Sequence, residues 1–236
     1  MNRFSVVLTW SAFCVQAMST AAIYQQPPVW SGNGANVGFS STSHVGSTLS
    51  GYNAFDNFTL GSAAVVDQVS WYGIYLSQAN TDGAPNTEHW NINFLTDNVG
   101  TPGTALSGTA LTLAQVTQSA VGSGFFGANA VTVYQFSANI NAFSASAGTQ
   151  YWFNVLNSAN NTSFPAFAWI AGSGGDNLSY QWTVTNGAIT ATASRPGDRA
   201  FSLSNSSATP EPSTMLMGAS GLLGMVLLRL RRRRQG

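Results

Sequence analysis

The sequence contains no lysine, and only 7% of its 236 residues are charged. An ordinary soluble domain has about 25% charged residues. Of the eight arginines, five lie in the last eight positions. Between the two ends of the chain, two arginines stand against seven acidic residues, which gives this body a net charge of −5. We therefore expect no nucleic-acid partner, because phosphate binding requires a basic surface.

Cysteine is nearly absent as well. The single Cys14 lies in an apolar N-terminal stretch. If export removes that stretch, the mature chain has neither a disulfide nor a cysteine metal site. Aromatic residues, by contrast, make up 12% of the chain. Disordered sequences contain few aromatic residues, so this chain is able to bury a core.

Residues 1–22 have the three parts of a secretory signal peptide. Arg3 provides the positive start, and an apolar segment runs from Phe4 to Val15. Small residues then supply the site that signal peptidase requires. We expect export through the Sec machinery and cleavage after Ala21 or Ala22. The alternative is an uncleaved anchor or a buried helix.

The C-terminal tail, residues 210–236, combines a short motif, an apolar run and a basic cluster. The motif is Pro210-Glu211-Pro212-Ser213, and the apolar run ends at Leu228. The basic cluster consists of Arg229, Arg231, Arg232, Arg233 and Arg234. As a helix, residues 213–228 extend about 24 Å at about 1.5 Å per residue, less than the roughly 30 Å of a bilayer core. The arginines nevertheless favour a transmembrane helix, because basic residues hold the cytoplasmic flank and snorkel outward.

These three parts, in this order, resemble the PEP-CTERM signal of Gram-negative bacteria. In that family an integral-membrane exosortase recognises the tail and processes it near the PEP motif. The family is associated with exopolysaccharide production and with biofilm or floc formation. The resemblance implies an exosortase substrate that passes through an inner-membrane intermediate to the cell surface or the extracellular space. An ordinary membrane anchor is the alternative.

The sequence pattern of the body of the chain predicts an all-β fold. Short aromatic and β-branched runs alternate with turn residues such as Asn186-Gly187, a pattern typical of a sandwich or barrel. In the clearest run, Trp90, Ile92 and Phe94 face one side. The predicted strands are 55–60, 65–76, 90–95, 110–116, 131–138, 151–156, 166–171, 180–184 and 199–203. We predict a loose lead-in at 23–53, a single jelly-roll-like β-sandwich at 54–203 and a polar linker at 204–209.

No constellation of catalytic residues emerges from this body. No serine has the flanking glycines of a nucleophile elbow. His89 and Glu88 are adjacent, so on a strand their side chains point to opposite faces. A glycosidase needs two carboxylates across a sugar, and Glu88 is the only glutamate outside the tail. We therefore expect a protein that is not an enzyme; an extracellular hydrolase with convergent carboxylates is an alternative.

Two further kinds of site are conceivable. Calcium binds carboxylate oxygens from loops, which makes Asp82, Asp97 and Asp176 candidate ligands of a structural calcium ion. Apart from that ion we expect no cofactor. Aromatic rings that share an exposed face stack on sugars, and Tyr72 and Trp182 are the candidates for such a platform. Aromatic residues within apolar runs, such as Trp90 and Trp169, are expected in the core instead.

The sequence thus predicts a non-enzymatic surface or extracellular-matrix protein that is sorted through its tail and linked to exopolysaccharide. The alternative hypothesis is a carbohydrate-binding module with an exposed aromatic platform. Under both hypotheses, the many small polar side chains are suited to contact with polysaccharide.

Overall fold

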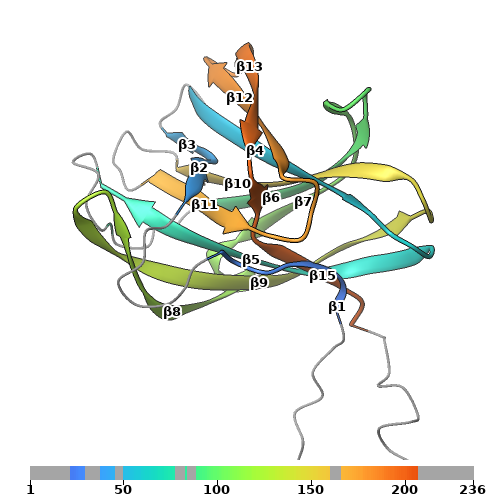
Figure 1. The fold of residues 1–236 in the computed structure, drawn as a ribbon, viewed down its shortest axis with the longest axis horizontal. Helices are drawn as coiled ribbons and strands as arrows, with labels where there is room; N and C mark the ends of the chain where they lie inside the picture. Colours follow the sequence, from blue (N-terminus) through green and yellow to red (C-terminus); the bar gives the residue numbers. More distant parts are fainter. Residues whose placement is uncertain are drawn as a thin grey trace, which may run out of the picture. The chain divides into compact units, whose positions relative to one another are not determined.

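The computed structural model describes residues 22–29, 38–45, 50–77, 83, 89–159 and 166–206. These residues form two β-sheets, which pack face to face (Figure 1). The described part of the chain contains no α-helix, and its one helical turn is the 3-10 segment η1 (Leu113–Gln115). The predicted all-β sandwich is therefore confirmed.

The first sheet has eight strands arranged around the long strand β5. Strand β9 pairs with one edge of β5, while β15 pairs with residues 68–71 and β11 with residues 73–76 on the other edge. The outer strands β1, β8, β14 and β2 extend this arrangement. The eight strands are β1 (Ala22–Gln26), β2 (Phe39–Ser41), β5 (Ala64–Leu76), β8 (Val116–Phe126), β9 (Asn129–Ala145), β11 (Ala166–Gly172), β14 (Asp198–Arg199) and β15 (Phe201–Ser204).

The second sheet has seven strands in the order β13-β12-β4-β3-β10-β6-β7. Strand β10 also pairs directly with β4, and all pairings are antiparallel except the short one between β3 and β10. The β12–β13 hairpin therefore forms one end of this sheet. The seven strands are β3 (Ser43–Val45), β4 (Ser50–Thr59), β6 (His89–Asp97), β7 (Pro102–Thr112), β10 (Gln150–Ala159), β12 (Leu178–Thr185) and β13 (Ala188–Pro196).

Most of the predicted strands coincide with observed ones, including 65–76 with β5 and 90–95 with β6. The prediction for 110–116 is wrong, because β7 ends at Thr112 and η1 precedes β8. Strands β8 and β13 were not predicted. Both consist mainly of small residues and are largely exposed, so neither shows the apolar alternation on which strand prediction depends.

Residues 23–53, for which the composition indicates a loose lead-in, contribute β1, β2, β3 and the first residues of β4. Strand β1 pairs with β15, and β2 pairs with β11. These early strands are short: β1 pairs with the similarly short β15, and β3 is inserted between the ends of β4 and β10. The segment therefore takes part in the sandwich although its own sequence carries little hydrophobic pattern.

Aromatic rings from both sheets fill the space between them. Trp71 of β5 stacks on Phe136 of β9, with ring centroids 5.5 Å apart and an interplanar angle of 9°. Trp90 of β6 crosses from the other sheet and lies 5.1 Å from each of these rings. Such contacts contribute about 0.5–1.5 kcal/mol per pair beyond the area they bury. Trp90 and Trp169 are fully buried, as the sequence predicts.

No helix among the described residues is long and apolar enough to cross a membrane. The predicted signal peptide lies outside the described residues apart from Ala22, the first residue of β1. The predicted transmembrane helix at 213–228 lies wholly outside them.

The Tyr75 hydroxyl provides a test of this packing. It is fully buried and has no hydrogen-bond partner among the residues that the structure describes, and burial raises the pKa of Tyr75. A buried polar group without a partner costs about 1–3 kcal/mol. We expect Tyr75→Phe to raise the free energy of unfolding by about 1 kcal/mol, because the ring contacts with Phe136 and Phe167 remain. Urea unfolding at unchanged m-value measures the change.

Tyr151→Phe is the matched control. The Tyr151 hydroxyl accepts a hydrogen bond from the backbone N–H of Ser146 at 3.1 Å, so its removal is expected to lower the free energy of unfolding by about 1 kcal/mol. If both variants are destabilised equally, the Tyr75 hydroxyl has a partner and the packing described above is wrong at this point.

Candidate functional site

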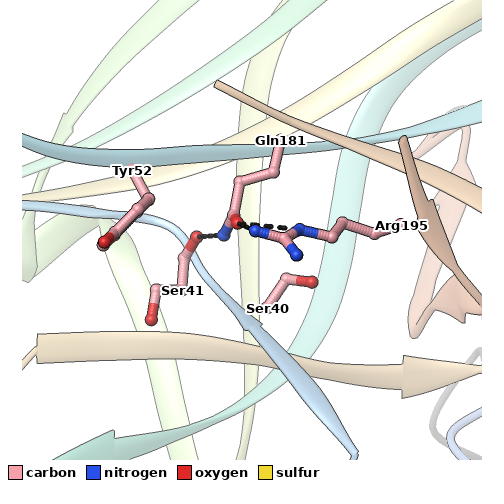
Figure 2. Close-up of a pocket in the computed structure, with 5 residues that line it drawn as sticks. All are labelled: Ser40, Ser41, Tyr52, Gln181 and Arg195. Carbon is pink, nitrogen blue, oxygen red and sulfur yellow. Dashed lines mark hydrogen bonds between the residues drawn. The ribbon is translucent and has the colours of Figure 1, made fainter. Parts of the chain in front are cut away.

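A polar pocket of about 300 Å³ opens between the two sheets. Ser40 and Ser41 of β2 form its side on the eight-stranded sheet. Tyr52 of β4, Gln181 of β12 and Arg195 of β13 form its side on the seven-stranded sheet (Figure 2). The five residues therefore come from four strands, and the packing of one sheet on the other brings them together.

A tight turn sets the position of Arg195. Strands β12 and β13 are joined by Asn186 and Gly187 alone, and both have positive φ angles of 52° and 76°. This is the geometry of a type I′ hairpin turn, for which Asn-Gly is the preferred sequence. The resulting register pairs Arg195 with Ser179 and places it diagonally across from Gln181 on the same face.

Gln181 holds the Arg195 guanidinium in one orientation. Its side-chain carbonyl accepts hydrogen bonds from Arg195 Nε at 3.1 Å and from Nη2 at 2.8 Å (Figure 2). The amide nitrogen of Gln181 donates to the backbone carbonyl of Ser41 at 2.9 Å. Gln181 thus links the arginine to the opposite sheet. Within the described part of the chain no carboxylate forms an ion pair with Arg195.

A second arginine, Arg199, stabilises the segment 196–199 that follows Arg195; we call this segment, with its partners on β4 and β12, the corner. Arg199 is only 3% exposed, and its Nε donates to the Ser179 hydroxyl at 3.1 Å. Its Nη2 donates to the carbonyls of Pro196 and Gly197 at 3.0 and 3.1 Å. Gly197 has a φ of +85°, a conformation that favours glycine. Arg199 therefore fixes the chain directly after Arg195.

Two buried aspartates anchor the same corner. Asp198 accepts hydrogen bonds from the backbone N–H groups of Gly175 and Asn177, at 2.9 and 2.7 Å. Asp56 accepts from the backbone N–H groups of Asn57 and Arg199. Burial raises the pKa of Asp56 well above its usual range, although these hydrogen bonds act in the opposite direction. Burial lowers the pKa of Arg199.

Two of the three candidate calcium ligands, Asp97 and Asp176, accept hydrogen bonds within the fold. Asp97 accepts hydrogen bonds from the indole N–H of Trp152 at 2.8 Å and from the backbone N–H of Gly100. Asp176 accepts from the backbone N–H of Leu178 and from the Asn57 amide. Asp82 lies outside the described residues. Among the residues that the structure describes, no group of three or more histidine, cysteine or acidic side chains is positioned to hold a metal ion.

The candidate sugar-stacking residues also lie apart. Tyr72 is on β5 of the eight-stranded sheet, where it packs against the apolar cluster around Ile74. Trp182 is on β12 of the other sheet, where its ring lies 4.4 Å from that of Phe55. They belong to different apolar clusters, so the structure does not join them in one platform.

The pocket residues were not identified from the sequence. Tyr52 stands in a glycine- and asparagine-rich stretch, and Gln181 has no distinguishing neighbour. Arg195 was the one available signal, because it is one of only two arginines in the body of the chain. Its partners depend on the register shift between Thr183 and Val184 and on the contact with β2, and neither leaves a signal in a single sequence.

Comparison with known proteins identifies the tail. A family model for the PEP-CTERM protein-sorting motif matches residues 208–233. The chain therefore carries this motif, which includes the predicted Pro210-Glu211-Pro212-Ser213 and the arginines up to Arg233; these residues lie outside the described part of the structure. No curated protein and no solved structure matches the chain.

The anchoring role of Asp198 is testable. Asp198→Asn replaces one of its two accepting oxygens with a donor, which leaves a backbone N–H of the 173–177 segment without an acceptor. Since Asp198 is 4% exposed, we expect the free energy of unfolding to fall by about 2 kcal/mol, measured by urea unfolding. The control is Asp67→Asn, because Asp67 accepts hydrogen bonds from Ser206 in an exposed setting. We expect this change to cost less than about 0.5 kcal/mol. Equal losses in the two variants would contradict the anchoring role.

Proposed function

We propose that the chain is an exported, non-enzymatic protein of the cell surface or extracellular matrix that associates with exopolysaccharide after its tail is processed. The PEP-CTERM motif at residues 208–233 carries this proposal. The motif implies export, a membrane-anchored intermediate and processing by an exosortase, which is a membrane enzyme. Signal peptidase and the Sec machinery act before that step in the proposed route.

The environment of the carboxylates supports a role other than catalysis. The five aspartates that the structure describes all accept hydrogen bonds within the fold: Asp56, Asp67, Asp97, Asp176 and Asp198. A general acid or base needs a carboxyl group within reach of substrate. These carboxylates instead stabilise turns and strands of the fold by accepting hydrogen bonds. The hydrolase alternative therefore finds no support in this part of the chain.

The second candidate function is that of a carbohydrate-binding module, which the pocket between the sheets favours. Its lining of hydroxyl, amide, guanidinium and phenol groups matches the chemistry of a sugar ring, which offers hydroxyl groups at its edge and C–H groups on its faces. The two proposals are compatible, because a matrix protein retained by polysaccharide needs a surface that binds it.

The sorting step is tested by the C-terminal mass of the protein recovered from its native host. We expect the wild type to end near Pro210 and to lack the arginine cluster. Glu211→Ala removes the only charge of the Pro-Glu-Pro-Ser motif, so we expect this variant to keep its full tail and to stay in the membrane fraction.

The control for this experiment is Ser207→Ala, which changes a residue just outside the matched segment. It is expected to be processed like the wild type. An intact arginine tail in the wild type would contradict the proposed processing and leave a membrane-anchored β-sandwich.

A further inference from the structure

Arg195 is a positive charge that a neutral partner holds in place. Gln181 occupies the Nε and Nη2 edge of the guanidinium through a single carbonyl oxygen. The edge formed by Nη1 and Nη2 has no hydrogen-bond partner among the described residues. A buried arginine is usually paired with a carboxylate, whereas this exposed one is oriented without being neutralised. Its orientation is thus fixed while its charge stays available.

The unused edge of the guanidinium fits a carboxylate. Two parallel N–H groups in a plane match the two oxygens of a carboxylate, and such paired hydrogen bonds are stronger than neutral ones. Arg195 is the only charged residue among the five described residues that line the pocket. The pocket therefore selects a ligand with one negative charge at a defined place.

The remaining lining indicates what carries that carboxylate. Tyr52 is 43% exposed at the pocket, so its ring offers an open apolar face with a polar tip, a combination suited to the C–H face of a sugar. Ser40 offers a side-chain hydroxyl on the opposite side, while Ser41 contributes the backbone carbonyl that accepts a hydrogen bond from Gln181 (Figure 2). A volume of about 300 Å³ lies at the lower end of small-molecule sites, which suits one or two sugar rings.

The charge of the whole body argues against general attraction of polyanions. Two arginines and seven acidic residues give the body a net charge of −5, which repels an anionic polymer at long range. Any preference for an acidic sugar must therefore arise in the pocket itself.

From these observations we infer that the pocket binds a uronate residue of an extracellular polysaccharide. Arg195 pairs with the carboxylate, Tyr52 covers one face of the ring, and the Ser40 hydroxyl exchanges hydrogen bonds with the hydroxyl groups of the sugar. This inference rests on the proposed association with exopolysaccharide and names the class of sugar that the association recognises.

The test is calorimetric titration of the full chain in detergent with trigalacturonate, with the neutral trisaccharide galactotriose and with inorganic sulfate. We expect trigalacturonate to bind, and galactotriose and sulfate to bind at least about tenfold more weakly. Arg195→Gln is expected to weaken trigalacturonate binding by about 10- to 100-fold. Arg195→Lys keeps the charge but loses the planar fork, and we expect it to recover only a small part of the affinity.

Further variants separate the pocket from the rest of the surface. Tyr52→Ala is expected to weaken binding about threefold to tenfold, whereas Phe125→Ala, which removes an exposed ring of β8, should leave it unchanged. Urea unfolding of each variant confirms that the fold is intact. Equal affinity for the acidic and neutral trisaccharides, equal affinity for sulfate, or an unchanged affinity of Arg195→Gln would overturn the inference.

The outcome is independent of the sorting experiment. Arg195→Gln retains the whole tail, and Glu211→Ala retains the whole pocket. Co-sedimentation with polysaccharide from the native host separates the remaining cases. Wild-type protein that co-sediments without affinity for trigalacturonate keeps the proposed function and overturns the uronate site alone.

Discussion

The hydrogen bond from the backbone N–H of Arg199 to the carboxylate of Asp56 joins the two sheets at the corner that carries the pocket. Asp56 lies on β4 of the seven-stranded sheet, and Arg199 lies on β14 of the eight-stranded sheet. The Arg199 side chain also donates hydrogen bonds to the Ser179 hydroxyl and to the backbone carbonyls of Pro196 and Gly197. The body of this chain has no cysteine, so no disulfide joins the sheets here, and the hydrogen bond to Asp56 holds β14 to β4. The burial of these polar groups is costly, but a satisfied buried network favours a single arrangement of the strands.

The rest of the sandwich depends on aromatic packing because charge is scarce. Trp71, Trp90 and Phe136 interlock across the two sheets. Within the described part of the chain, this packing leaves two polar groups of β5 without hydrogen-bond partners, the Trp71 indole N–H and the Tyr75 hydroxyl. Both lie on the strand that pairs with β9, β15 and β11. At the centre of the fold, ring packing thus outweighs the loss of two hydrogen bonds.

The sequence predicts the fold best where burial alternates along a strand. Residues 90–94 alternate cleanly, and β6 presents Trp90, Ile92 and Phe94 to the core. Strand β13 is exposed along its whole length, so only its pairing with β12 makes it a strand. The pocket is harder to predict, because Arg195 meets Gln181 through a two-residue turn and a register shift between Thr183 and Val184. Ser40 and Ser41 enter from the other sheet, and such a contact between sheets leaves no periodic trace in one sequence.

The small size of the pocket has a consequence for how such a protein would be retained in a matrix. A site that encloses one or two sugar rings has limited affinity, because each ring offers few groups to bind. A polysaccharide, however, presents the same residue many times along one chain. Each dissociation is then followed by rebinding at a neighbouring residue at high effective concentration. Retention on a polymer therefore does not require tight binding of one saccharide, and a single oriented guanidinium is sufficient chemistry for the proposed uronate site.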